Sequence, residues 1–142
     1  MTDIRISKTD WASDQAGLSG LRRRVFIEEQ HVPEELEWDE HDAACPHFLA
    51  TDADGTPVGC IRLLPTGQVS RLCVLQERRS EGIGRRLLDA AVAEARRLGL
   101  REIFLHAQTH ATSFYESAGF SVDGGIFVEA GIPHRLMVKQ LT

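Results

Sequence analysis

Apolar residues recur along the chain at two different spacings, and each spacing predicts a different kind of element. Over residues 14–30 they recur at three- and four-residue steps, which predicts a helix with Leu18, Leu21 and Val25 on its buried face. Residues 82–98 show the same spacing more completely. We predict a second helix there, with one apolar face made of Ile83, Leu87, Leu88, Ala91, Ala95 and Leu98.

A third, shorter helix is predicted over residues 109–118. Gly99 and Gly119 follow the second and third helices and are expected to end them as C-caps. The acidic segment 31–42 contains Pro33, so it is expected to be irregular or to form only a short helix.

Runs rich in β-branched and apolar residues, bounded by turn residues, predict the strands. They are residues 4–7, 47–51, 58–64, 69–74, 102–107, 120–122 and 134–141. The turn residues 52–55 make the second and third of these a hairpin. The strand at 102–107 should run parallel to the strand at 69–74, because a helix crosses between them. A Gly-rich connection joins the last two strands.

This order of elements predicts an α+β fold with a mixed, mostly antiparallel central sheet and helices on both faces. A chain of 142 residues has the ordinary size of one domain, so we expect a single domain over residues 1–142.

The turn between the strand at 69–74 and the second helix carries two glycines, Gly82 and Gly84. Glycine has no side chain, so a ligand can approach the main chain closely there. The unpaired N–H groups of the first helical turn and the helix dipole favour negative charge at the same place. We therefore expect a phosphate-bearing cofactor at this turn.

Known phosphate motifs differ in the residues around their glycines. A nucleoside-triphosphate loop needs Lys and then Ser or Thr after its last glycine, and an Arg-Arg pair stands there instead. A dinucleotide fingerprint needs a third small residue where Leu87 stands, although Glu102 would suit as its ribose-binding acid. The pattern that remains is Arg79-x-x-Gly82-x-Gly84.

The chain carries a formal net charge of −5 at pH 7, with 42% hydrophobic and 26% charged residues. This composition is ordinary for a globular protein, and the acidic balance argues against nucleic acid as the main partner. Five arginines nevertheless gather in the sequence around the expected anion site: Arg71, Arg78, Arg79, Arg85 and Arg86.

No apolar run reaches the roughly 18 residues of a membrane span, and the first residues lack the features of a signal peptide. Cys45, Cys60 and Cys73 lack zinc-type spacing, so we expect free thiols in a reducing cytoplasm. His41, Cys45 and His47 lie close in sequence, but no second pair completes a site, and no metal is expected.

The glycine pattern resembles the acyl-CoA diphosphate motif of the GNAT family of N-acetyltransferases, Arg/Gln-x-x-Gly-x-Gly/Ala. Residues 114–120, FYESAGF, resemble the same family's Phe-Tyr-Glu-x-x-Gly-Phe. Residues 25–30 (VFIEEQ) and 131–137 (GIPHRLM) resemble segments of the bacterial subgroup named after ElaA and YjcF. The order of elements is also similar to the GNAT fold along almost the whole chain.

The resemblance implies acetyl-CoA as co-substrate. In this fold the strand before the glycine turn diverges from its parallel neighbour, and the pantetheine arm lies between them. Main-chain groups of Leu72, Cys73 and Val74 would bond the pantetheine amides. Gln108 stands where the family usually has an asparagine that bonds the cofactor. The diphosphate would be held by main-chain N–H groups of Arg79, Ser80, Glu81, Gly82, Ile83, Gly84 and Arg85.

Tyr115 is the candidate catalytic acid that the resemblance implies. A phenol has an ordinary pKa near 10 and an alkyl thiol one of about 8.5, so a phenol in contact can protonate a departing thiolate. The alternative is a core tyrosine packed between Phe114 and Phe120.

The group that takes the proton from the amine stays open among Glu28, Glu29, His106 and His134. Three of them, Glu29, His106 and His134, are also expected near the acceptor substrate. An acyl-enzyme on Cys73 is conceivable, but a thiol inside a strand is expected to be buried and inert. We therefore expect direct transfer from acetyl-CoA.

The expected activity is transfer of the acetyl group of acetyl-CoA to a primary amine of a small molecule or peptide. The alternatives are a non-catalytic acyl-CoA-binding or sensing module, and an interaction domain whose acidic residues 34–42 dock a basic partner. If residues 34–42 line the acceptor pocket, cationic amines would be favoured. Neither nucleic acid nor a membrane is expected as a partner, and pairing along the last strands leaves a homodimer open.

Overall fold

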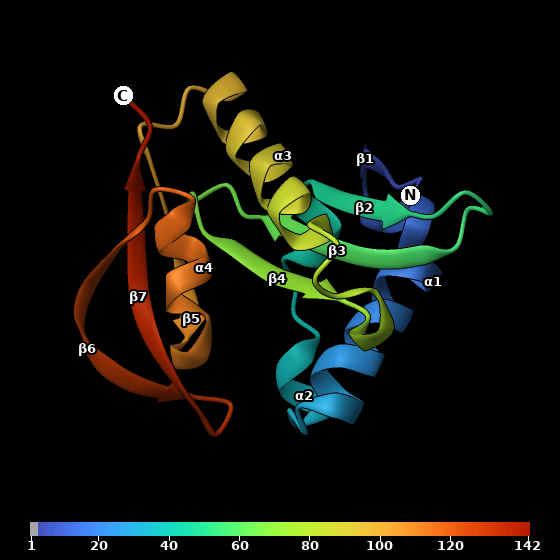
Figure 1. Cartoon of the computed structure of the whole chain (residues 1–142), viewed down its shortest axis with the longest axis horizontal. Coiled ribbons are helices and arrows are strands. Elements are labelled where there is room, and N and C mark those ends of the chain that lie inside the picture. Colours follow the sequence, from blue (N-terminus) through green and yellow to red (C-terminus); the bar gives the residue numbers. More distant parts are fainter. Residues whose placement is uncertain (1–2) are drawn as a thin grey trace.

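The computed structural model describes residues 3–142 and shows two sheets that diverge from each other, with helices packed on them (Figure 1). The first sheet comes from the N-terminal half of the chain and the second from the C-terminal half. The predicted α+β fold with helices on both faces of the sheet is confirmed.

The first sheet is antiparallel and consists of β1 (Arg5–Thr9), β2 (His47–Thr51), β3 (Pro57–Leu63) and β4 (Val69–Val74), in that order. Every residue of β3 after Pro57 is buried. The reason is that α1 (Trp11–Arg22) and α3 (Ile83–Arg97) pack on its two faces. Gly59 lets α3 come close, because a Cβ there would lie 3.0 Å from Leu87 Cδ1.

The second sheet has the order β5-β7-β6, again antiparallel, with β5 (Glu102–Gln108), β6 (Ser121–Glu129) and β7 (Ile132–Gln140). The prediction of a short strand at 120–122 followed by a Gly-rich connection is wrong. Gly124 and Gly125 lie inside β6, where the register shifts. This bulge and the exposure of the edge strand remove the two-residue alternation that identifies a strand.

The strands β4 and β5 run parallel, as predicted, but they meet at one point only. An isolated bridge pairs Gln68 with Phe104, and the Phe104 N–H donates to Gly67 O at 3.1 Å. No further ladder joins the two strands in the described chain, so the predicted single sheet is divided there. Arg71 has a φ of 58° at a register shift in β4, and such a bulge bends the strand.

The first predicted helix is present but changes form part-way. After Arg22, α1 continues as the π-helical segment η1 (Arg23–Glu29), in which Gln30 N–H donates to Val25 O at 3.1 Å. Its predicted apolar face is buried as expected: Leu18, Leu21 and Val25. π-Helical turns are uncommon and are frequent at functional sites.

The other two helices also agree with the sequence, apart from their ends. In α3 the predicted face is buried except for Leu98, which is 50% exposed and follows the last helical residue. The third predicted helix consists of the 3-10 turn η4 (Thr109–Ala111) and α4 (Thr112–Ser117). In the part of the chain that the structure describes, none of the helices has the length and apolarity needed to cross a bilayer.

Candidate active site

The glycine turn follows the short 3-10 turn η3 (Gln76–Arg78) and leads into α3. Gly82 has a φ of 82°, which glycine adopts without strain, and a Cβ there would meet no atom within 4 Å. The Arg86 N–H makes the first hydrogen bond of the helix, to Gly82 O at 3.2 Å. The preceding N–H groups, of Ile83, Gly84 and Arg85, therefore have no acceptor within the helix. Together with the helix dipole, these donors suit the anion that the sequence predicts here.

Arg79 connects this turn with β4 and with η1. Its Nε donates to Val74 O at 3.0 Å, and its two terminal nitrogens bind the Glu29 carboxylate at 2.7 and 2.8 Å. The hydrogen bond from Arg79 lowers the pKa of Glu29. Glu29 thus lies beside the glycine turn as an ionised, engaged carboxylate, an arrangement that disfavours it as a proton acceptor. Glu28 is exposed.

Most arginines near the turn already have carboxylate partners. Arg78 Nε lies 3.2 Å from Glu81 Oε2, and Arg85 Nε lies 3.0 Å from Asp89 Oδ1. Arg86 is exposed and has no ion pair with any residue between 3 and 142. An incoming phosphate would therefore meet main-chain donors first, with the arginines supplying a surrounding positive field that is partly neutralised.

The main chain of β4 presents alternate residues to the gap between the sheets. Leu75 N–H donates to Val58 O of β3 at 2.9 Å, so the main-chain groups of Val74 point the other way, toward the gap. By the same alternation, the main-chain groups of Cys73 point toward β3, where Cys73 is paired with Cys60. The predicted main-chain contact from Cys73 is therefore less favourable than those from Leu72 and Val74.

The Cys73 side chain is directed into the first sheet. Its Sγ lies 3.6 Å from Cys60 Sγ, and both residues are buried. This hydrogen bond and the burial raise the pKa of the Cys73 thiol well above its ordinary value. The arrangement supports the expectation of an inert thiol. Cys45, Cys60 and Cys73 are all free and buried.

Tyr115 lies on α4, next to the first turn of α3. Its ring packs edge-on against Phe114 at 5.0 Å and Phe120 at 6.0 Å, between ring centres. The Phe114 ring in turn lies 3.7 Å from where a Cβ of Gly84 would be. Burial raises the pKa of Tyr115 to about 12, so the hydroxyl keeps its proton. Within residues 3–142 that hydroxyl makes no hydrogen bond.

A cleft of about 540 Å³ lies between β4 and the second sheet, lined also by residues from η1 and the segment after it. Gln108 of β5 and Gln30 join its two walls, since Gln108 Nε2 donates to Gln30 Oε1 at 2.8 Å. Gln108 is the residue predicted to bond the cofactor in place of asparagine. The side-chain amide of Gln108 is thus already hydrogen-bonded, to Gln30, which also lines the cleft.

Two predicted histidines lie on the second-sheet wall of this cleft, together with a carboxylate that the sequence did not single out. His106 Nδ1 is 2.9 Å from Glu129 Oε1, and His134 is buried with its Nδ1 2.7 Å from Ile132 O. Glu129 belongs to the half of β6 that was predicted as a connection. If the second half of β6 had the alternating pattern of a strand, the sequence would have predicted Glu129 opposite the start of β7.

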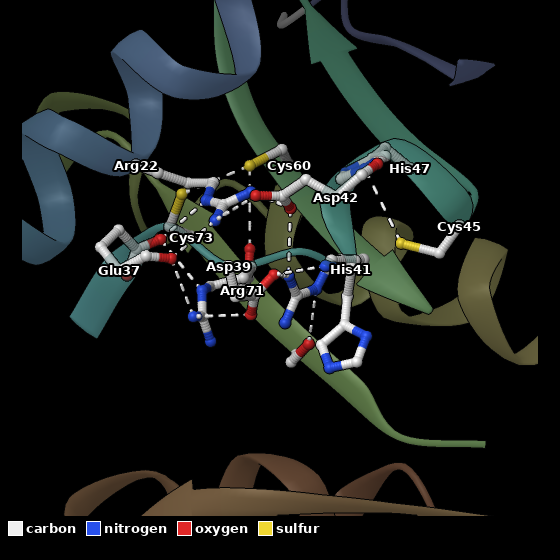
Figure 2. Close-up of polar contacts among 12 residues, drawn as sticks. Arg22, Glu37, Asp39, His41, Asp42, Cys45, His47, Cys60, Arg71 and Cys73 are labelled. Carbon is white, nitrogen blue, oxygen red and sulfur yellow. Dashed lines mark hydrogen bonds and ion pairs between the residues drawn. The ribbon is translucent and has the colours of Figure 1, made fainter. Parts of the chain in front are cut away.

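The opposite wall rests on buried charges (Figure 2). Arg22 of α1 is completely buried and binds Glu37 Oε2 and Asp42 Oδ1, each at 2.7 Å. Its guanidinium also lies 5.4 Å and 5.2 Å from the ring centres of Trp11 and Trp38. This cluster holds α2 (Glu34–Glu37) and η2 (Asp42–Ala44) against the first sheet.

Two further arginines extend this cluster toward the cleft. Arg62 Nη1 lies 2.8 Å from Asp39 Oδ1, and Arg71 Nε lies 3.0 Å from Glu37 Oε2. The sequence groups Arg71 with the arginines near the expected anion site, but in the structure Arg71 lines the cleft. The bulge at its positive φ redirects its side chain there. Arginines thus bind Glu37, Asp39 and Asp42 of the acidic segment, and Glu37 and Asp39 line the cleft.

Of the group His41, Cys45 and His47, only the last two meet, with 3.8 Å between Cys45 Sγ and His47 Nε2. His47 Nε2 lies 2.9 Å from Asp42 O, and burial lowers the pKa of His47. His41 is exposed at the rim of the cleft. Across residues 3–142, no three or more His, Cys, Asp or Glu side chains are grouped as metal ligands.

Residues 9–141 match the acetyltransferase (GNAT) domain family. The Bacillus subtilis (strain 168) protein YyaT is 38% identical over 128 residues, which cover 86% of this chain and 86% of YyaT. YjcF of the same organism, described as an uncharacterized N-acetyltransferase, is 37% identical over 123 residues, which cover 84% of this chain and 87% of YjcF. The chain belongs to the GNAT acetyltransferase family.

Solved structures give the same result at the level of the fold. An acyl-CoA N-acyltransferase from Pseudomonas aeruginosa superposes with a TM-score of 0.86 at 28% identity, and Escherichia coli ElaA with 0.87 at 25% identity. Both alignments cover 96% of this chain and 99% of the other. The resemblance to the ElaA and YjcF subgroup is confirmed, and the protein is an acetyltransferase.

Proposed function

We propose that the protein transfers the acetyl group of acetyl-CoA directly to a primary amine of a small molecule or peptide. The observation that carries this proposal is the open glycine turn at the end of a strand that has separated from its parallel neighbour. The turn offers main-chain donors to a diphosphate, and the gap offers strand edges to an extended arm. The cleft between β4 and the second sheet then receives the amine.

The pantetheine arm would lie along β4. The Val74 carbonyl is already occupied by Arg79, so the Val74 N–H and the main-chain groups of Leu72 are the positions left for its amides. The diphosphate would reach the N–H groups of Ile83, Gly84 and Arg85. Arg79 would then stabilise the turn while remaining bound to Glu29.

The transfer itself needs no covalent enzyme intermediate. The amine nitrogen attacks the thioester carbonyl carbon, the C–N bond forms, the C–S bond breaks, and the thiolate leaves with the bonding electron pair. Tyr115 donates its hydroxyl proton to that thiolate. Burial raises the pKa of Tyr115, and it would act in the same direction on a thiolate placed beside it, so the two values stay close enough for transfer.

A matched pair of glycine substitutions tests the anion site. Gly82 and Gly55 have φ values of 82° and 81°, and neither has an atom within 4 Å of a built Cβ. Gly82→Val and Gly55→Val should therefore lose similar stability, while only Gly82→Val should lose acetyl-CoA binding by calorimetry. Equal affinity in both variants would remove the glycine turn from the proposal.

A non-catalytic acyl-CoA-binding module is the second candidate. The unengaged hydroxyl of Tyr115 and the paired side chains in the cleft favour turnover instead. Release of free CoA thiol from acetyl-CoA, measured across a panel of small amines and peptides, separates the two. Binding without release in every case would support the module.

A further inference from the structure

Three polar side chains of the second sheet form a connected group in the cleft. His106 lies on β5, Glu129 ends β6, and His134 lies on β7 opposite Phe127. The Phe127 ring packs edge-on against His106 at 5.1 Å and stacks on His134 at 5.9 Å, between ring centres. The shared phenyl ring fixes the relative positions of the two imidazoles.

The Glu129 carboxylate lies between the two imidazoles. Its Oε1 is 2.9 Å from His106 Nδ1, and its Oε2 is 3.9 Å from His134 Nε2. An ionised carboxylate can only accept, so Nδ1 of His106 carries the ring proton and Nε2 carries the lone pair. No residue between 3 and 142 bonds that Nε2, and the His106 side chain is 30% exposed in the cleft.

His134 is held in a different way. Its Nδ1 is 2.7 Å from Ile132 O, and a carbonyl also only accepts, so Nδ1 again carries the proton. The side chain is only 7% exposed, and its Nε2 lies 3.9 Å from Glu129 Oε2, too far for a hydrogen bond. The structure thus separates two histidines that the sequence had left equivalent: His106 has a basic nitrogen open to the cleft, and His134 does not.

We propose that His106 takes the proton from the acceptor amine and that Glu129 is the residue that positions it. As the N–C bond forms, an N–H bond breaks; its electron pair stays on the new amide nitrogen, and the proton moves to His106 Nε2. The thiolate receives its own proton from Tyr115. Glu129 holds the ring and stabilises the imidazolium that results. This inference rests on the proposed transfer to an amine.

The charge around this pair also indicates which acceptors fit. The Glu129 side chain is 50% exposed, so it can attract an acceptor in its ammonium form, which loses one proton to solvent before the neutral amine nitrogen attacks. On the facing wall Asp39, Glu37, Arg62 and Arg71 are paired with one another, and His41 lies at the rim. The Glu129 and His106 pair therefore offers the accessible carboxylate, and a cationic amine is the class of acceptor that suits it.

The test compares His106→Gln with His110→Gln, the same change at an exposed histidine on η4. Putrescine is the probe, because its second ammonium group complements the exposed Glu129 carboxylate. We expect kcat for CoA release to fall by about 10²-fold or more in His106→Gln, the size of a general-base contribution. Its acetyl-CoA affinity should stay unchanged, and the acid limb of its pH profile should disappear. His110→Gln should keep all three.

Glu129→Gln tests the positioning role, because it keeps an acceptor for Nδ1 and removes the charge. Loss of the carboxylate charge disfavours a protonated ring, so the acid limb should move to lower pH in this variant. A purely structural role for Glu129 would lower activity without moving the limb.

The outcomes are distinguishable from those of the proposed function. Unchanged kcat and an unchanged acid limb in His106→Gln would contradict this inference and leave the acetyltransfer proposal standing. A defect confined to acetyl-CoA affinity would also contradict it. If the unaltered protein binds acetyl-CoA but releases no CoA, with putrescine or with water as acceptor, His106 has no such role. If it does not bind acetyl-CoA, both proposals fail.

Discussion

The glycine turn and the cleft, the two parts of the proposed active site, are built in opposite ways. The turn is a single short segment, in which Gly82 and the following N–H groups present partial charges from the main chain. The cleft is assembled from side chains that are distant in sequence, such as His106 and Glu129 at a separation of 23 residues. A local site of main-chain donors depends little on remote packing, whereas an assembled site of full charges depends on every element that carries them.

The largest effect is expected from breaking the charge cluster under the cleft wall. Arg22→Met removes one of the two arginine partners of buried Glu37 and of buried Asp42, leaving Arg71 and Arg62, and breaking a buried pair costs about 3 to 5 kcal/mol. Chemical denaturation should show that loss. The KM for an amine should rise more than the Kd for acetyl-CoA, because the cluster supports the cleft and not the turn.

Arg23→Met is the matched control for this variant. Arg23 is the next residue, and its pair with Glu34 is exposed on both sides, so its loss should cost about 0 to 1 kcal/mol. If Arg22→Met weakened both ligands equally while remaining folded, the two sites would not be independent.

Tyr115→Phe tests the proposed general acid. Removing the hydroxyl should lower kcat by about one to three orders of magnitude, the range of a general-acid contribution, with acetyl-CoA affinity unchanged. Tyr115 is the only tyrosine in the chain, so the phenolate absorbance of the unaltered protein reports its ionisation directly. That absorbance should rise near pH 12 rather than near pH 10. An undiminished kcat would remove Tyr115 as the acid.

The smallest effect is expected from a carboxylate outside both sites. Hydrogen bonds from Arg97, at 2.6 Å, and from Lys8 of β1, at 2.8 Å, lower the pKa of Glu94 to about 2. A carboxylate with a depressed folded-state pKa stabilises the fold fully above its unfolded pKa of about 4.3, and that contribution is lost as the pH falls toward 2. Glu94→Gln should therefore flatten the fall of Tm over this window.

Asp89→Asn, at an exposed position of the same helix, should leave that slope unchanged. Glu94→Gln should leave acetyl-CoA and amine affinity at neutral pH unchanged. A change in either affinity for Glu94→Gln would show that the packing of α3 on β1 reaches one of the sites.

The same contrast explains how much the sequence could predict. The faces of α1 and α3 and the hairpin of β2 and β3 follow from local periodicity, and the glycine turn follows from a contiguous motif. The division of the sheet does not, because it depends on a bulge at Arg71 whose positive φ has no sequence signal in a non-glycine residue. The second half of β6 was missed because Gly124 and Gly125 interrupt its alternation.

The assembled site was predictable only in part. His106 and His134 could be proposed as residues near the acceptor, but what separates their roles is a carbonyl of Ile132 and the carboxylate of Glu129, both fixed by strand register. Glu37 and Asp42 belong to an acidic run whose partners the sequence does not predict. They are buried because arginines of α1 and β3 meet them, a pairing between elements that no spacing within the run reveals.

The isolated bridge between Gln68 and Phe104 joins the two sheets at one point. An extended molecule bound between the two sheets would complete a continuous sheet and become part of the folded structure. A ligand that binds only the folded chain raises its stability with the logarithm of its free concentration. We therefore expect the folded enzyme to persist longer when the concentration of its thioester donor is high, and to be lost faster when that concentration is low.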